Sequence, residues 1–136
     1  MSYQCVYQRR YDYPLDEEGI TLFTRLMTNR QDILVEAKLD TGAAFCLFER
    51  SCAEQLGVEV EKGYKRRLNT LTGSFDAYDH EVTLKTLELE FDLTVFFPAD
   101  YAISRNLLGR NWLRLVRLGL VDYDGLLYLS GYDEEQ

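Results

Sequence analysis

The sequence has few of the residues from which metal sites, disulfide frameworks and membrane spans are built. It contains three cysteines, one histidine and two prolines in 136 residues. Three cysteines without a CxxC pair do not make a disulfide framework, and one histidine cannot complete the usual Cys/His zinc set. No apolar run approaches the roughly 20 residues that span a bilayer, and the N-terminus lacks the apolar segment of a secretory signal. We therefore expect a cytoplasmic protein with reduced thiols, no metal and no membrane association.

Positive charge is also scarce. The net charge is -8, and residues 69–136 hold only 5 basic side chains against 12 acidic ones. This balance argues against nucleic acid or an anionic membrane as a partner. The ordinary interpretation is a solvated acidic surface, with an acidic face for a basic partner as the alternative.

Short apolar stretches separated by turn residues predict a mostly β, single-domain protein with two short helices. Residues 33–39 give the period-2 alternation of a half-buried strand, and residues 87–95 give the clearest alternation in the chain. Helices are predicted at 49–56 and 110–118, each followed by a glycine. The other predicted strands are 20–27, 65–71, 75–84 and a last hairpin of 120–123 with 126–130 across Asp124-Gly125.

Asp40-Thr41-Gly42 follows directly on the strand predicted over 33–39. The tripeptide by itself is a weak signal, because Asp and Gly are common at strand-end turns. Its context strengthens it. A glycine-tipped hairpin follows, and then the segment Asn106-Leu-Leu-Gly-Arg-Asn111 precedes the second predicted helix.

These segments, in this order and at this separation, resemble the retropepsin family, the single-domain aspartic proteases of retroviruses and their cellular relatives. The resemblance covers about residues 19–130. It implies a closed acid-protease β-barrel that is active as a homodimer. It also implies an N-terminal extension over 1–18, a protease domain over 19–130 and an acidic tail over 131–136.

The resemblance assigns roles to individual residues. Asp40 matches the catalytic aspartate, Thr41 the residue whose hydroxyl ties the two active-site loops together, and Gly42 a position where backbone passes close to substrate. The segment that packs behind the catalytic loop corresponds to Leu107, Leu108 and Gly109. The residues expected to contact substrate, in the loop and at the tip of a flap, are Ala43, Ala44, Leu71, Thr72, Gly73 and Ser74.

The implied activity is hydrolysis of a peptide or protein substrate by an aspartic endopeptidase that needs no cofactor. Two facing carboxylates share one proton, because like charges about 3 Å apart cannot both ionise. One carboxylate takes a proton from the attacking water, and the other donates a proton to the carbonyl oxygen. A chain with one Asp-Thr-Gly must obtain its second Asp40 from another copy, which implies a C2 homodimer.

Two departures from the retroviral pattern keep a second interpretation open. Position 44 is alanine, where retroviral members usually carry an acid that pairs with the arginine found here as Arg110. Arg110 must then pair elsewhere, with Asp100, Asp122 or a partner chain. The tyrosine-rich N-terminal extension forms either an added edge strand or a different interface. The alternative function is a non-catalytic dimerisation or peptide-binding module of the same fold.

A thiol mechanism is a third and remote alternative. His80 with Cys46 or Cys52 has the composition of a Cys–His nucleophile pair. The ordinary interpretation is that His80 is a strand or loop residue and that both cysteines are small apolar fillers. Cys52 supports it, because it lies on the apolar face of a predicted helix.

Overall fold

The computed structural model describes residues 1–134, so the end of the expected acidic tail, 135–136, lies outside the described residues. The strands are β1 Arg9–Asp12, β2 Thr21–Met27, β3 Asp32–Leu39, β4 Cys46–Leu47, β5 Lys65–Thr70, β6 Gly73–Thr86, β7 Leu89–Pro98, β8 Leu107–Leu108, β9 Val116–Val121 and β10 Leu126–Gly131. The helices are α1 Arg50–Gln55 and α2 Arg110–Leu113, with short 3-10 turns η1 Val60–Lys62 and η2 Asp122–Asp124.

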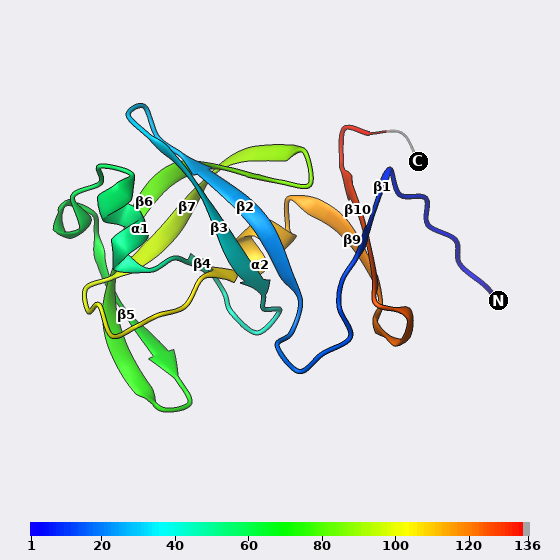
Figure 1. The fold of residues 1–136 in the computed structure, drawn as a ribbon, viewed down its shortest axis with the longest axis horizontal. Coiled ribbons are helices and arrows are strands. Elements are labelled where there is room, and N and C mark those ends of the chain that lie inside the picture. Colours follow the sequence, from blue (N-terminus) through cyan, green and yellow to red (C-terminus); the bar gives the residue numbers. More distant parts are fainter. Residues whose placement is uncertain (135–136) are drawn as a thin grey trace.

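Six strands close into a barrel in the order β2-β3-β8-β4-β7-β6, because β6 returns to pair with β2 (Figure 1). The alternation predicted for β3 is present, with the residues at positions 33, 35, 37 and 39 turned inward. β5 adds to β6 as an antiparallel hairpin. The predicted mostly β barrel with two short helices is confirmed.

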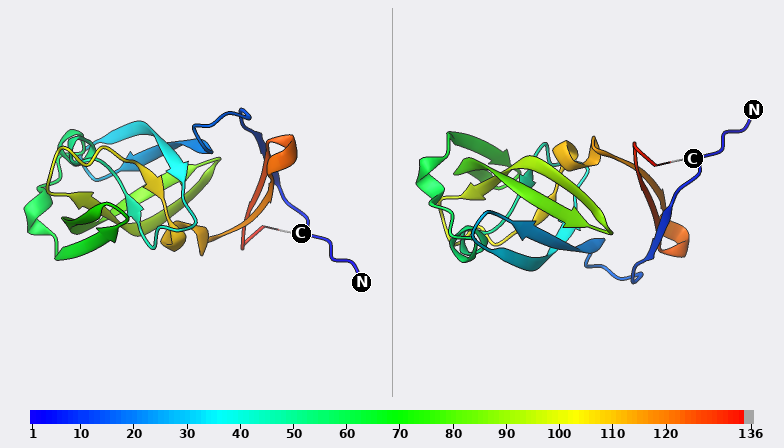
Figure 2. Two further views of the ribbon diagram at one scale, coloured as in Figure 1. Left: turned by 90° about the horizontal axis from the view of Figure 1, so that it is seen from below. Right: turned by 90° about the horizontal axis from the view of Figure 1, so that it is seen from above.

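The two ends of the chain form a second sheet, in the order β1-β10-β9, which lies beside the barrel (Figure 2). The N-terminal extension therefore supplies an added edge strand. Its tyrosines secure it: the Tyr7 ring stacks on Tyr128 at 5.8 Å, and the Tyr13 hydroxyl donates to Asp122 Oδ1 at 2.6 Å. The face of β10 packs on the barrel, so Leu127 joins the same core as the barrel strands.

The helix predicted over 110–118 is wrong beyond Leu113, because Val116 begins β9. Apolar positions in this stretch fit a helix as well as a strand when only local spacing is considered. The pairing with β10 decides the outcome, since Val116 lies opposite Gly131 and Leu118 opposite Leu129. The predicted helix stop, Gly119, is instead in mid-strand, where an added Cβ would be 2.9 Å from the Tyr7 ring.

The last hairpin was expected to turn at two residues, Asp124 and Gly125, and this is also wrong. Val121 pairs with Leu126, which leaves a four-residue loop over 122–125. Asp122 and its neighbours form a 3-10 turn, and the Gly125 N–H donates to Asp122 O at 3.0 Å. Gly125 has φ +65°, so the glycine is needed, but at the end of a longer loop.

Leu87 and Glu88 form the tight turn between β6 and β7, and both have positive φ, 48° and 69°. The strand predicted over 87–95 therefore begins two residues later, at Leu89. Turns of this kind usually contain Asn or Gly, since other residues in the left-handed region are strained. The sequence carries no turn residue here, which is why the alternation alone misplaced the boundary.

Glu88→Gly should stabilise the protein by about 1 kcal/mol, because glycine relieves the left-handed strain at an exposed position. Thermal and urea unfolding would measure the change. Glu90→Gly is the matched control at an exposed, regularly paired position of β7, where glycine should cost roughly 0.5–1 kcal/mol. An equal loss of stability in both variants would contradict a strained backbone at Glu88.

Candidate active site

Asp40 lies immediately after β3, where β3 meets β8. Its backbone N–H donates to Leu108 O at 3.0 Å, which continues the pairing of Leu39 with Leu108. The half-buried Asp40 carboxylate accepts a hydrogen bond from the Gly42 N–H at 2.9 Å. The Ala43 N–H donates to Asp40 O at 3.2 Å. The loop thus turns back on its own aspartate and orients the carboxylate.

Gly109 allows the second motif to pack directly behind this loop. A Cβ at position 109 would lie 2.5 Å from Phe45 O and 2.9 Å from Ala43 O, both backbone atoms that cannot move aside. The next N–H, of Arg110, donates to Ala43 O at 2.7 Å. The match of residues 107–109 to a supporting segment therefore has a physical basis in close backbone contact.

Asn111 is a supporting residue for which the sequence suggested no individual role. Its Oδ1 accepts from the Cys46 N–H at 2.9 Å, and its Nδ2 donates to Thr94 O at 2.6 Å. Its own N–H donates to Ala44 O at 3.2 Å. One side chain thus joins the segment that follows Asp40 to β7. Its place in the Gly-Arg-Asn segment was the available signal.

Thr41 is exposed, and its hydroxyl forms no hydrogen bond within residues 1–134. The Asp40 carboxylate likewise has no donor in the described chain besides the Gly42 N–H. Both groups therefore remain open to a further molecule or chain.

The β5–β6 hairpin extends from the barrel, with its turn at Leu71 and Thr72. Leu71 is fully exposed, and the Thr70 hydroxyl donates to Gly73 O at 2.8 Å across the turn. Gly73 has φ +138°, a conformation that favours glycine. Four residues were expected at the tip of a flap. Leu71 and Thr72 form the turn, whereas Gly73 and Ser74 are the first two residues of β6.

One face of this hairpin is apolar. Leu68 lies opposite Phe75, and Ala77 follows on the same face. These side chains pack in an apolar cluster separate from the main core, together with Phe45, Leu47, Phe96, Ile103 and Leu107. The cluster connects the hairpin to the segment that follows Asp40. From the sequence, Ala43, Ala44 and apolar residues of the flap are expected to line side-chain pockets. Phe45 is not among them, although its place just after the Asp-Thr-Gly segment was an available signal.

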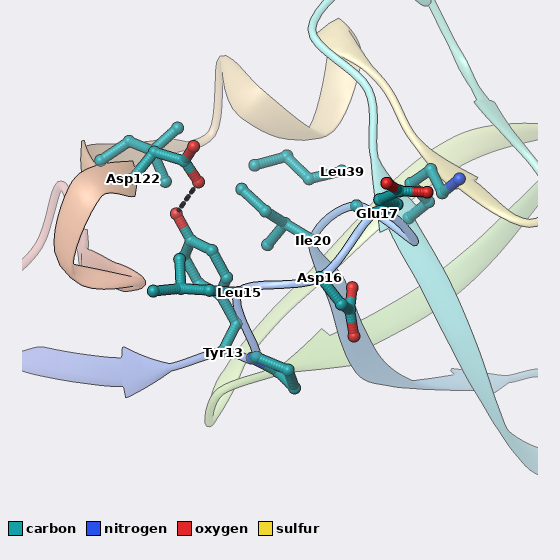
Figure 3. A pocket seen from close by; sticks show the side chains of 11 residues that line it. Tyr13, Leu15, Asp16, Glu17, Ile20, Leu39 and Asp122 are labelled. Atoms are coloured by element: carbon teal, nitrogen blue, oxygen red, sulfur yellow. Dashed lines mark hydrogen bonds between the residues drawn. The ribbon is translucent and has the colours of Figure 1, made fainter.

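Two hollows lie beside the strand that leads to Asp40, and Asp40 itself lines neither of them. One of about 600 Å³ lies between residues 13–20 and the barrel, where Leu15, Ile20 and Leu39 surround it (Figure 3). The other, of about 420 Å³, is lined by charged side chains including Lys38 and Arg105, with Leu107 beside them. Apolar and charged surfaces thus both lie within a few residues of the Asp-Thr-Gly segment.

Arg110 has no ion pair within residues 1–134, so the expected pairing with Asp100 or Asp122 is wrong. Asp122 accepts the Tyr13 hydroxyl, and Asp100 Oδ1 accepts the Ala102 N–H at 2.8 Å. The exposed guanidinium of Arg110 is therefore available to a partner or ligand.

The thiols do not form a nucleophile pair. Burial raises the pKa of both Cys46 and Cys52 to about 11, which keeps them as unreactive thiols at neutral pH. The His80 Nε2 donates to Val60 O at 2.8 Å, so the ring is occupied elsewhere. Within the described chain no three His, Cys, Asp or Glu side chains gather as metal ligands, and no described helix has the length and apolarity to cross a membrane.

Comparison with known proteins gives consistent results. A family model described as "Aspartyl protease" matches residues 27–112. A retropepsin-like aspartic protease from Rickettsia conorii has the same fold, with TM-score 0.63 and 17% identity over 90% of this chain and 98% of that one. EIAV protease in complex with the inhibitor HBY-793 has a TM-score of 0.58 and 20% sequence identity, over 72% of this chain and 88% of that chain. The retroviral protease-like domain of Ddi1 from Leishmania major has a TM-score of 0.55 and 15% sequence identity, over 86% of this chain and 92% of that chain. A search of curated proteins finds no match.

Proposed function

The chain belongs to the aspartyl protease family and has a retropepsin-like fold, and on that premise we propose that it is an aspartic endopeptidase in which two chains each supply Asp40. The main support is the geometry of Asp40. Its carboxylate is oriented by its own loop, the loop rests on a glycine that admits no side chain, and an apolar hairpin face stands beside it. A module that only binds peptides has no physical need for a carboxylate held in this way.

The proposed chemistry needs two carboxylates and one water. The ionised member of the Asp40 pair removes a proton from the water as its oxygen attacks the scissile carbonyl carbon. The protonated member donates its proton to the carbonyl oxygen, which gives a tetrahedral diol without a covalent enzyme intermediate. The C–N bond then breaks as the leaving nitrogen takes the proton from the pair. A diol hydroxyl gives its proton to the pair as the new carboxyl group forms, which restores the shared-proton state.

Substrate would bind as an extended strand. Backbone groups beside Gly42 and along the β5–β6 hairpin would hydrogen-bond to it, and the apolar cluster of Phe45, Leu68 and Phe75 would receive its side chains. Ala43, Ala44 and the hairpin residues 71–74 remain proposed contacts. We assign the protease unit to residues 19–130, with residues 1–18 as an extension and 131–136 as a tail.

We place the contact between the two copies at β9. This strand pairs only with β10 in the described chain, so its second edge has free backbone groups. At the end of β9 the exposed fractions of Leu120 and Val121 are 46% and 42%. Leu15, which lines the same 600 Å³ hollow as Leu120, is 67% exposed. Because β1 already occupies the other side of β10, pairing of β9 with the partner's β9 would extend one sheet through both copies.

The proposal is tested by cleavage of an unbiased peptide library, followed by mass spectrometry from about pH 4 to 7.5. Cleavage by a preparation shown to be dimeric would support the enzyme. Absence of cleavage would favour the second candidate, a peptide-binding module of the same fold. The unpaired Arg110 is the observation that favours this candidate, since the loop lacks its usual charged support.

Treatment of the folded protein with iodoacetamide at pH 7.5 should leave peptide cleavage unchanged. Only Cys5 is exposed, whereas Cys46 and Cys52 are buried with raised pKa values. Intact-mass analysis should show a single alkylation alongside full activity. Loss of activity in step with modification of Cys46 or Cys52 would instead support the thiol mechanism.

A further inference from the structure

We propose that the cleft selects peptides with acidic side chains next to an apolar cleavage site. The inference rests on the proposed function and adds its substrate class. The chain as a whole has a net charge of -8, which by itself would repel such peptides. Two exposed arginines beside the segment that follows Asp40, Arg66 and Arg110, offer the opposite charge, since neither has an ion pair within residues 1–134.

Arg66 is the central residue of this proposal. It lies opposite Ala77 and two positions before Leu68, so it shares the apolar face of the hairpin. Its guanidinium carbon is 4.8 Å from the centre of the Phe45 ring. A guanidinium that stacks on an aromatic ring keeps its N–H groups at the edge, where they can donate to a carboxylate. Arg66 has no acidic partner among the described residues.

Arg67 provides an internal contrast on the same strand. It points to the other face of the hairpin, where its Nη1 donates to Asp76 at 2.9 Å and its Nε to Ser74 at 3.0 Å. Its charge is therefore neutralised on the side away from the apolar cluster. The two neighbouring arginines thus differ in the face they occupy and in their pairing, and the one on the apolar face has no ion pair.

The wall formed by β3 and the segment before β8 adds two more cations. Lys38 lies opposite Leu107 and two residues before Asp40, and Arg105 lines the same hollow of about 420 Å³. Glu36 and Glu49 also line this hollow. The Glu49 oxygens accept the Ser51 and Ser104 hydroxyls. With two cations and two carboxylates, this hollow contributes no excess of positive charge, and the selection depends on the arginines beside it.

Arg110 is the second unpaired arginine beside the loop that follows Asp40. Its backbone N–H is bound to Ala43 O, while its exposed side chain has no ion pair among residues 1–134. The alanine at position 44 is what leaves it free, because the sequence offers no acid there. Arg66, stacked on Phe45, and Arg110, bound through its backbone to Ala43, therefore flank the segment that follows Asp40 with two unpaired positive charges.

Surface charges act over a short distance in salt solution, so the charges next to a bound peptide matter more than the net charge of the chain. Surface charges are screened over about 10 Å at 0.1 M salt, so a bound peptide senses mainly the cleft. An unpaired guanidinium can form a charge-assisted hydrogen bond to a carboxylate. We expect about a tenfold preference for an acidic peptide over its amide counterpart at low salt.

The test compares three peptides that share an apolar cleavage site and differ only in the flanking residue, which is Glu, Gln or Lys. The ratio of kcat/KM between the Glu and Gln peptides should be about tenfold at 50 mM salt and fall toward one at 500 mM. Arg66→Gln should reduce this ratio several-fold, and Arg110→Gln should reduce it as well. Arg67→Gln is the matched control and should keep the wild-type ratio.

Binding of the same labelled peptides to the Asp40→Asn dimer, followed by fluorescence anisotropy, measures the preference without hydrolysis. The Glu peptide should again bind most tightly, and this result would support the inference even if no peptide were cut. Cleavage of all three peptides with equal or higher efficiency for Lys would overturn it and leave the protease proposal standing. Absence of cleavage by a verified dimer, with the binding preference intact, would instead count against the protease alone.

Discussion

Asp40→Asn should abolish peptide hydrolysis, with a loss on the order of 10⁴-fold, while the chain still folds and dimerises. An amide cannot take a proton from water or donate one to the carbonyl oxygen in the way a carboxyl pair does. Its oxygen can still accept the Gly42 N–H that now binds Asp40 Oδ1 at 2.9 Å. Rates on a library-derived peptide would be measured beside unfolding temperature and sedimentation velocity.

Glu81→Gln is the matched control for Asp40→Asn. It removes one carboxylate from an exposed position of β6 and should leave the rate unchanged. Mixtures of wild type and Asp40→Asn give a sharper test of the pairing. If each site needs an Asp40 from both chains, activity should fall with the square of the wild-type fraction after subunit exchange. A linear fall would show that each chain acts alone.

The double change Leu120→Glu and Val121→Glu should convert the dimer to a monomer and remove activity with it. Both side chains are about half exposed in the single chain, so the monomer should fold nearly as well. In the proposed dimer the partner's β9 would bring four carboxylates together at a poorly solvated contact, and like charges there cost several kcal/mol. Sedimentation velocity and the dependence of rate on protein concentration would measure the loss.

Leu34→Glu is the control for this change. Leu34 is also an exposed leucine, at 56%, but it lies early in β3, away from the terminal sheet. It should therefore leave both the dimer and the rate intact. A dimer that survives the double change with full activity would place the contact elsewhere, and the β9 assignment would fail while the Asp40 proposal would remain testable.

The interface and the catalytic pair differ in how far the sequence could predict them. Asp40 stands in a short motif, and the strand before it shows its alternation over consecutive residues. The free edge of β9 has no such signal, because it depends on β1 occupying the far side of β10. The first residues of β9, up to Leu118, were predicted from the sequence to belong to the preceding helix.

The same limit applies to the substrate cleft. The hairpin expected to act as a flap was predicted with Thr72-Gly73-Ser74 at its tip. It forms, but its turn lies at Leu71 and Thr72, and Gly73 and Ser74 belong to β6. Which of its arginines lies on the apolar face of the hairpin follows only from register. Arg66 and Arg67 are adjacent and chemically identical, yet one stacks on Phe45 and the other pairs with Asp76.

Sequence alone determined the mostly β class, the positions of the β2 and β3 strands, and the Asp-Thr-Gly and Leu-Leu-Gly-Arg-Asn segments. These features depend on neighbouring residues, whose spacing sets which side chains share a face. Tertiary structure decided where α2 ends, what the N-terminal tyrosines contact, and which cations remain unpaired around Asp40. Each of those outcomes depends on partners far away in the chain, such as Val116 with Gly131, and a local pattern holds no information about them.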